Sequence, residues 1–393
     1  MNKFKIINGK ILTPNRMISG MIYVESGKIR EVSEGNPEIP GAHIIDARGC
    51  YVSPGFIDIH THGAGNHDFM DGTPEAYLQI AETHAAYGTT SLYPTTLAST
   101  TEELEQTFAV YKEAKTKNKK GASFMGLHLE GPYLSMNQKG AQDPQYIRNP
   151  NKEEYLKILE NAEHIARWSS APELEGSEEF AETLRRFNIL PAIGHSDAIY
   201  EEVEKAYDWG YTHVTHLYSC TSGVTRRNAL RYAGIIEASY LIPGMTVEII
   251  ADGVHLPASL LKLVYQIKGA DKIALITDSM RAAGMPDGSS MLGSLKNGQP
   301  VIIEDGVAKL PDRSAFAGSV ATANRLVRVM NTLGEVPLSD AIRMITSTPA
   351  KIMGIDKTKG SLTKGKDADI VIFNENIDIK AVIINGELIL NNF

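Results

Sequence analysis

Residues 54–63 read PGFIDIHTHG, an apolar run that ends in two histidines two positions apart. Side chains at alternate positions of a strand project to the same face, so His60 and His62 can reach one metal ion. The pair alone is weak evidence for a metal site. In a parallel α/β barrel, however, the chemistry gathers at the carboxyl ends of the strands, and this run places two ligand candidates at such an end.

Seven further strand-like runs follow, separated by helix-length amphipathic or polar segments. This βαβα alternation indicates a parallel sheet. Together with residues 51–60 they make eight strands over about 230 residues. This strand number and chain length are typical of a (β/α)8 barrel. The seven runs are TTSLYPTTL (89–97), SFMGLHLE (123–130), IARWSSAPE (165–173), ILPAIGHSD (189–197), THVTHLYS (212–219), MTVEIIADG (245–253) and KIALITDS (272–279).

An open doubly wound sheet is the alternative architecture, and a dinucleotide-binding sheet of that type carries a G-x-G-x-x-G turn after its first strand. The chain has neither that turn nor a Walker A sequence. Its polar residues instead close many different strands, as a barrel site requires. We therefore predict an α/β fold, a (β/α)8 TIM barrel.

The two ends of the chain share a sequence pattern that differs from that of the central region. Short β-type runs near the N-terminus are split by the turn-forming pairs Asn8-Gly9 and Ser26-Gly27, and the last 35 or so residues repeat this pattern. Since chain termini usually lie close together at a domain surface, residues 1–53 and 357–393 are expected to build one small β-sandwich domain. The barrel is expected to span residues 54–356.

The composition is that of an ordinary globular enzyme. The chain has 393 residues, 42% of them hydrophobic and 22% charged, with a net charge of -8 that argues against binding to nucleic acid. The N-terminus lacks the apolar core of a signal peptide, and no apolar run reaches about 18 residues. We expect a cytoplasmic protein with no membrane partner, in which Cys50 and Cys220 are free thiols.

The candidates for metal ligands close four strands of the predicted barrel. Imidazole and carboxylate groups suit zinc first, and they also accept iron, manganese or cobalt. The predicted cofactor is therefore a divalent metal, with zinc preferred. The five ligand candidates are His60, His62, Glu130, His195 and His216.

Asp278 closes the last strand and lies outside the H-x-H pair. A divalent metal lowers the pKa of bound water toward about 7 and polarises a carbonyl, which favours hydrolysis. The leaving amine must then be protonated, so a carboxylate near the water has to take a proton and deliver it. We assign this catalytic role to Asp278, with an N-cap of the following segment as the structural alternative.

These residues lie in motifs that resemble the amidohydrolase superfamily and, more narrowly, its N-acetylglucosamine-6-phosphate deacetylase family. The resemblance covers essentially the whole chain, and HLEGP followed by GHS and THL is its most specific part. The motifs are PGFIDIHTHG (54–63), GLHLEGPYL (126–134), KGA (139–141), APE (171–173), GHSDA (194–198), THLYS (215–219), ADGVH (251–255), TDSM (277–280) and AGS (317–319).

The resemblance implies a role for each matching position. Glu130, His195 and His216 would hold the principal ion, and His60 with His62 would hold a second, so that one or two ions bind. Asp278 would be the general acid/base. Substrate contacts would come from residues in or next to the KGA, THLY, ADG-x-H and AGS segments and from one arginine, namely Ala141, Gln142, Ser219, Cys220, Arg227, His255, Phe316, Ala317 and Gly318.

The arginine and His255 would bind a sugar phosphate, often across the interface of a homodimer. A planar guanidinium makes bidentate, charge-assisted bonds to phosphate, and either Arg227 or its neighbour Arg226 can do so. The alternative for this arginine pair is a solvated loop charge. The predicted partners are thus an amino-sugar phosphate and a second copy of the chain.

Two departures from the family pattern concern the substrate. Gln142 stands where the family has a histidine that polarises the substrate carbonyl, and Ser219 with Cys220 replaces Asn and Ala. A second ion held by His60 and His62 can replace that polarisation. The expected reaction is deacetylation of N-acetylglucosamine-6-phosphate. The alternatives are N-acetylgalactosamine-6-phosphate or another N-acyl amino-sugar phosphate, an N-acyl amino acid or cyclic amide, and a metal-binding relative without turnover.

Overall fold

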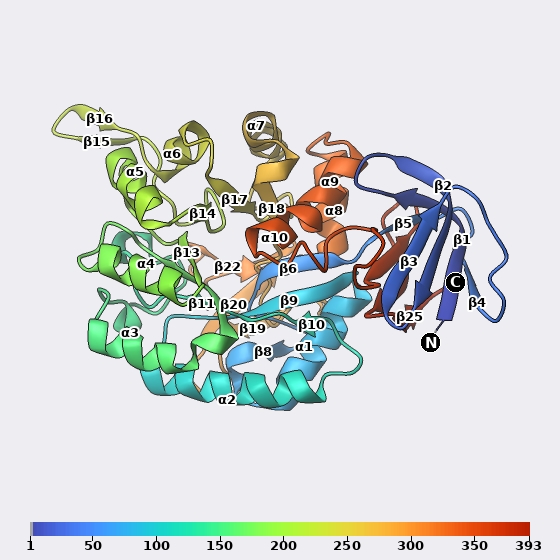
Figure 1. Cartoon of the computed structure of the whole chain (residues 1–393). Coiled ribbons are helices and arrows are strands. Elements are labelled where there is room, and N and C mark those ends of the chain that lie inside the picture. Colours follow the sequence, from blue (N-terminus) through green and yellow to red (C-terminus); the bar gives the residue numbers. More distant parts are fainter. Residues whose placement is uncertain (1–2) are drawn as a thin grey trace.

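Eight parallel strands form a nearly closed barrel in the computed structural model, which describes residues 3–393 apart from the side chain of Ala162 (Figure 1). Seven of them fall within the runs identified from the sequence, and β6 ends one residue past its run. The strands pair in chain order, so the predicted fold class is confirmed. A short strand β10 (Ser123–Phe124) also pairs with β9. The barrel strands are β6 (Phe56–Thr61), β9 (Thr89–Thr96), β11 (Leu127–Glu130), β12 (Ile165–Ser170), β13 (Leu190–Ile193), β14 (His213–Val214), β17 (Thr246–Ile249) and β18 (Ile273–Leu275).

The barrel closes where the residues after β18 meet β6. The backbone N–H of Asp278 donates to the carbonyl of His60 at 2.9 Å, and the N–H of His62 donates to the carbonyl of Ser279 at 2.8 Å. These two bonds place the ends of the first and last strands side by side. The residues predicted to act chemically on these two strands are therefore neighbours in space.

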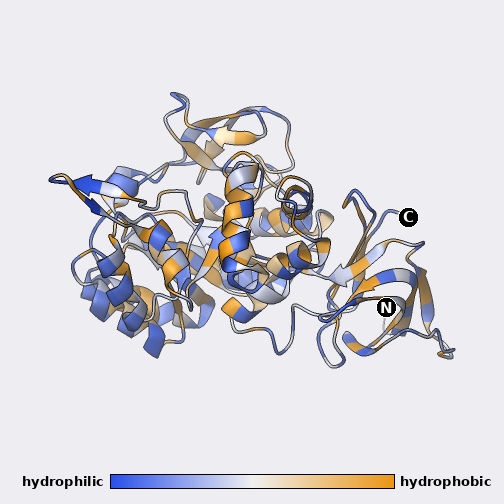
Figure 2. Cartoon of the chain, turned by 90° about the horizontal axis from the view of Figure 1, so that it is seen from above, coloured by the Kyte–Doolittle hydropathy of each residue, from blue (hydrophilic) through white to orange (hydrophobic). Residues whose placement is uncertain are grey.

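Helices surround the barrel, and hydrophobic and hydrophilic residues alternate along them (Figure 2). In α4, for example, Phe180 and Leu184 are fully buried, and Phe180 packs edge-on against Trp168 of β12 with ring centroids 5.0 Å apart. Burial of these apolar faces stabilises the helices on the barrel. The helices are α1 (Pro74–Ala86), α2 (Thr101–Lys117), α3 (Lys152–Ile158), α4 (Ser177–Arg186), α5 (Tyr200–Trp209), α6 (Ile235–Leu241), α7 (Ala258–Lys268), α8 (Ala323–Thr332), α9 (Leu338–Ile345) and α10 (Ser347–Ile352).

The two chain ends build a second sheet beside the barrel, as expected (Figure 1). Strand β5 joins the two ends, because it pairs with β1 on one side and with β23 on the other. The domain limits at 53/54 and 356/357 remain a prediction. The strands of this sheet are β1 (Lys3–Leu12), β2 (Met17–Glu25), β3 (Lys28–Ser33), β4 (His43–Asp46), β5 (Tyr51–Pro54), β23 (Ile370–Phe373), β24 (Ile379–Ile384) and β25 (Glu387–Asn391).

A four-stranded antiparallel sheet, which was not predicted from the sequence, follows β18. It consists of β19 (Gly288–Leu292), β20 (Gln299–Glu304), β21 (Val307–Lys309) and β22 (Phe316–Ser319). Its last strand forms a bridge to the barrel end, between Ser319 and Ser279. A small hairpin, β7 (Gly63–Ala64) with β8 (His67–Asp68), follows β6 on the same side of the barrel.

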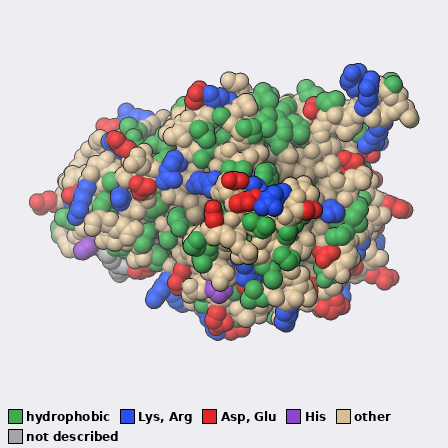
Figure 3. Space-filling view, turned by 180° about the vertical axis from the view of Figure 1, so that it is seen from behind, with side chains coloured by type: hydrophobic (Ala, Val, Ile, Leu, Met, Phe, Trp, Pro, Cys, Tyr) green, Lys and Arg blue, Asp and Glu red, His purple; other side chains and the backbone are tan. Residues whose placement is uncertain are grey.

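A second unforeseen hairpin, β15 (Thr225–Arg227) with β16 (Leu230–Tyr232), projects away from the barrel (Figure 1). Arg226, Arg227 and Arg231 on this hairpin are all exposed. In the view from behind, basic side chains gather on a projecting tip at the upper right (Figure 3). Across residues 3–393, no helix combines the length and apolar character needed to cross a membrane.

Candidate active site

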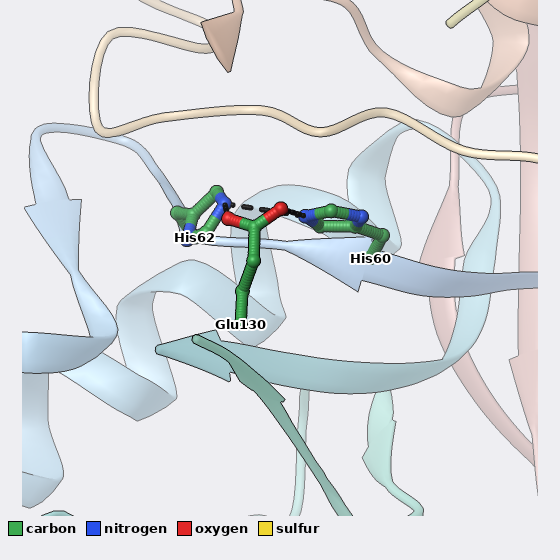
Figure 4. A group of neighbouring side chains, drawn as sticks. All are labelled: His60, His62 and Glu130. Atoms are coloured by element: carbon green, nitrogen blue, oxygen red, sulfur yellow. Dashed lines mark hydrogen bonds and ion pairs between the residues drawn. The ribbon is translucent and has the colours of Figure 1, made fainter. Parts of the chain in front are cut away.

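His60 and His62 both point at the carboxylate of Glu130 across the mouth of the barrel (Figure 4). The Nε2 atom of His60 lies 3.5 Å from Glu130 Oε1, and that of His62 lies 3.4 Å from Oε2. The two Nε2 atoms are 3.3 Å apart. All three side chains are buried, so this triad of ligand atoms is shielded from bulk water.

A second triad shares the same carboxylate. His195 and His216, which follow β13 and β14, direct their Nε2 atoms to Glu130 Oε1 at 3.3 and 2.9 Å. Two groups of three ligand atoms, each compact enough for one ion, therefore meet at Glu130. The donor set of imidazole nitrogens and one carboxylate fits a divalent transition metal.

Three residues at the mouth adopt the left-handed backbone conformation. His195 has φ 48°, His216 has φ 29° and Asp278 has φ 45°. Each lies shortly after the end of a barrel strand. Its left-handed conformation turns the chain away from the strand direction at the mouth. Such conformations cost about 1–3 kcal/mol each in non-glycine residues and cluster at functional sites.

Asp278 lies against the first histidine pair. Its Oδ1 is 3.4 Å from His60 Nε2 and 3.3 Å from His62 Nε2. Beneath it, the buried carboxylate of Asp58 accepts hydrogen bonds from the backbone N–H of His60 and from the hydroxyl of Thr277. Asp58 thus ties the strand that carries the histidines to the strand that carries Asp278.

Charged neighbours shift the pKa values of residues in both triads. Burial alone lowers the pKa of His62, but the carboxylates of Asp278 and Glu130 outweigh it and raise this pKa to about 10. Burial alone raises the pKa of Glu130, but His60 and His195 hold it well below its usual range. A proton on His62 partly balances the buried carboxylates, and a bound cation would take its place.

A cavity of about 270 Å³ opens above these groups. Its lining includes Glu130, His62, His195 and Asp278. It also includes seven of the nine residues expected to contact substrate, namely Ala141, Gln142, Ser219, Cys220, His255, Phe316 and Gly318.

Two of the expected substrate residues lie elsewhere. Ala317 is fully buried in the cluster around Met280, between two residues that do line the cavity. Arg227 stands on the projecting hairpin, where its guanidinium lies 5.7 Å from the ring centroid of Tyr232. Arg226 lies on the same exposed strand. Neither arginine lines the cavity of its own chain.

Gln142 and His255 are both held by specific partners. The amide of Gln142 donates to Glu130 Oε2 at 2.8 Å and accepts from the backbone N–H of Ala98 at 2.8 Å. The Nδ1 atom of His255 lies 2.7 Å from Asp252 Oδ2. Gln142 therefore contacts the shared carboxylate, and Asp252 leaves the other nitrogen of His255 available to the cavity.

Three buried charged residues next to the site were not predicted from the sequence: Asp58, Arg167 and Glu248. Each lies inside one of the eight apolar runs. A charged residue within a buried parallel strand is unusual, because such strands read as near-continuous hydrophobic runs. That irregularity was the available signal.

The family model for the amidohydrolase family matches residues 51–389. The chain belongs to the amidohydrolase family. This confirms the resemblance to the amidohydrolase superfamily that the strand-end motifs indicate.

Two curated relatives of this amidohydrolase are sugar-phosphate deacetylases. The N-acetylglucosamine-6-phosphate deacetylase of Bacillus subtilis (strain 168) is 33% identical over 384 residues, which cover 96% of this chain and 95% of that protein. The N-acetylgalactosamine-6-phosphate deacetylase of Escherichia coli O157:H7 is 31% identical over 338 residues, covering 86% of this chain and 87% of that protein.

A solved structure also matches the amidohydrolase over its full length. It is a mutant N-acetyl-D-glucosamine-6-phosphate deacetylase from Mycobacterium smegmatis in complex with N-acetyl-D-glucosamine-6-phosphate. The TM-score is 0.91 at 27% sequence identity, and the match covers 100% of both chains.

Metal binding should release protons. The carboxylates of Asp278 and Glu130 raise the pKa of His62 to about 10, so this histidine is protonated at neutral pH and must lose its proton to bind an ion. Affinity for zinc should therefore rise with pH up to about pH 10. Calorimetric titrations in buffers of different ionisation enthalpy check this, and binding heats that do not depend on the buffer would contradict it.

Proposed function

We propose that this amidohydrolase hydrolyses the N-acetyl group of N-acetylglucosamine-6-phosphate to give glucosamine-6-phosphate and acetate. The observation that carries the proposal is the Glu130 carboxylate shared by two histidine pairs, with Asp278 beside it at the floor of a cavity. The full-length similarity to deacetylases of this substrate supports it.

In this proposal Glu130, His195 and His216 hold one divalent ion, and Glu130, His60 and His62 hold a second. The two ligand triads that share Glu130 support two ions per chain. Zinc is the preferred metal, and iron, manganese and cobalt are the alternatives. When bound, such an ion activates water and polarises the amide carbonyl.

Asp278 is the proposed proton carrier. Its carboxylate accepts a proton from the attacking water and returns it to the nitrogen of the breaking C–N bond, so that an amine and acetate leave. Its position supports this role, because Oδ1 of Asp278 lies 3.4 and 3.3 Å from Nε2 of His60 and His62 and the residue also lines the cavity.

The phosphate is proposed to bind His255 and an arginine from a second copy of the chain. Along residues 3–393, the cavity lining includes no lysine or arginine. The arginine hairpin projects from the surface, and Val224, Leu230 and Leu241 on or near it are more than 60% exposed. A homodimer would bury these apolar side chains. It would also bring Arg227 to the partner's cavity, where the arginine supplies a cation for the phosphate.

The cytoplasmic location expected from the sequence is also part of the proposal. Both Cys50 and Cys220 are free, and a reducing compartment keeps thiols in that state.

A second candidate substrate is N-acetylgalactosamine-6-phosphate. The Escherichia coli O157:H7 relative that acts on this isomer is nearly as similar to the chain as the Bacillus subtilis relative. Ser219 and Cys220, which depart from the family pattern, both line the cavity and are placed to distinguish sugars.

The substrate assignment predicts acetate release from N-acetylglucosamine-6-phosphate by purified protein of known metal content. The galactosamine isomer, unphosphorylated N-acetylglucosamine and an N-acetyl amino acid serve as comparisons in the same assay. Release from the galactosamine isomer but not from the glucosamine compound would make the second candidate correct. Release from the amino acid alone would exclude both sugars.

Substitution Asp278→Asn should reduce kcat by about 100- to 10,000-fold, because it removes the group that moves the proton. Metal content should not change, since the ligand atoms of both triads remain. Asp287→Asn is the matched control, because Asp287 is exposed and follows the same strand. A fully active Asp278→Asn protein would rule out the catalytic role.

Substitution Arg227→Ala should raise KM for the phosphorylated sugar about 10-fold or more, since one charge-assisted hydrogen bond contributes about 1.5–3 kcal/mol. The rate on unphosphorylated sugar should stay the same. Arg226→Ala is the control on the neighbouring position. If only Arg226→Ala raises KM, the phosphate ligand is Arg226, and if neither does, the phosphate role of the hairpin is excluded.

A further inference from the structure

A buried ion pair lies inside the barrel, directly beneath the histidines of the candidate metal site. Arg167 of β12 and Glu248 of β17 are both fully buried, and the guanidinium contacts the carboxylate. The interior of such barrels is usually filled by branched apolar side chains. A buried pair of charges is also weak evidence for stability, because desolvation offsets much of the attraction. Stability alone therefore does not explain why this pair is buried beneath the site.

The carboxylate of Glu248 reaches both histidine pairs. Its Oε2 lies 3.2 Å from Nδ1 of His60 and accepts the backbone N–H of His216 at 3.3 Å. The opposite nitrogen of His60, Nε2, faces Glu130 and Asp278. The ring of His60 is thus held between Glu248 below and the ligand cluster above.

Arg167 holds Glu248 in this orientation. Its guanidinium donates to the hydroxyl of Thr215 at 3.0 Å and to the carbonyl of Ile59 at 3.4 Å, while it pairs with Glu248 Oε1. These contacts span strands β6, β12 and β17 and the residue after β14. Oε2 of Glu248 thus faces His60 and the backbone N–H of His216.

His60 differs in this respect from the other three candidate ligands. The Nδ1 atoms of His195 and His216 lie 2.8 and 3.0 Å from the backbone carbonyls of Gln138 and Ser219. Nδ1 of His62 has no hydrogen-bond partner within the described part of the chain. Among these four, His60 alone has a carboxylate on the nitrogen away from the site, in the part of the chain that the structure describes.

We propose that Glu248 is a positioning residue that keeps the proton of His60 on Nδ1, so that Nε2 presents its lone pair to the ion held with His62. A carboxylate behind a ligating histidine fixes its tautomer and orientation and raises its basicity as a ligand. Arg167 compensates the charge of Glu248 and keeps it in place. The inference rests on the two-ion site of the proposed function.

The test compares double variants that preserve charge balance, since Glu248 substitution alone leaves Arg167 unpaired and risks unfolding the barrel. The variant Arg167→Met/Glu248→Leu removes the acceptor for His60, whereas Arg167→Met/Glu248→Gln keeps an uncharged one. Zinc affinities are measured by chelator competition. The first variant should bind one of its two ions about 10- to 100-fold more weakly, and the second should recover part of the loss.

The matched control is Lys359→Met/Asp369→Leu. Lys359 and Asp369 form another buried pair, with Nζ 2.5 Å from the carboxylate, next to the sheet built by the chain ends. Both zinc affinities should equal those of the wild type. Equal affinities in Arg167→Met/Glu248→Leu as well would overturn the inference while leaving the deacetylase proposal intact. A wild-type protein that holds a single ion overturns the two-ion site and this inference together.

A second test uses the wild-type protein and therefore does not require a variant that folds. Neutron diffraction from crystals of the metal-loaded protein should show deuterium on Nδ1 of His60, directed at Glu248. An Nδ1 without deuterium overturns the inference.

Discussion

Both histidine pairs of the site are built around the single carboxylate of Glu130. It lies within 3.5 Å of an Nε2 atom of His60, His62, His195 and His216, and neither triad is complete without it. Each oxygen has its own set of neighbours, because three histidines meet Oε1 while His62 and Gln142 meet Oε2. A shift of this one side chain would therefore disturb both candidate ion sites at once.

The barrel supplies the geometry that this carboxylate needs. Hydrogen bonds between the ends of the first and last strands bring Asp278 to the first histidine pair, and left-handed turns follow the strands that precede His195, His216 and Asp278. Below the mouth, Asp58 accepts a hydrogen bond from the backbone of His60, and Glu248 lies against the ring of His60. The strain at the mouth and the buried charges beneath it are thus two parts of one arrangement, which orients ligand atoms at the expense of stability.

The site residues that lie at the ends of apolar runs could be predicted from the sequence, because they depend only on the local pattern. Glu130, His195 and Asp278 each close an apolar run, and counting the runs was enough to predict the barrel that brings them together. The pairing of Arg167 with Glu248 could not be predicted in this way, because the partners are 81 residues apart and meet only inside the closed barrel. The position of Arg227 on a projecting hairpin and the sheet of β19–β22 likewise depend on tertiary structure rather than on periodicity.

In the proposed function, Glu130 is a carboxylate ligand of both ions. The most direct measurement is anomalous diffraction at the metal absorption edge from crystals of the purified, metal-loaded protein. The account predicts two anomalous peaks, one near His195 and His216 and one near His60 and His62, each about 2.0–2.2 Å from an oxygen of Glu130. A single peak, or peaks that do not touch Glu130, would contradict it.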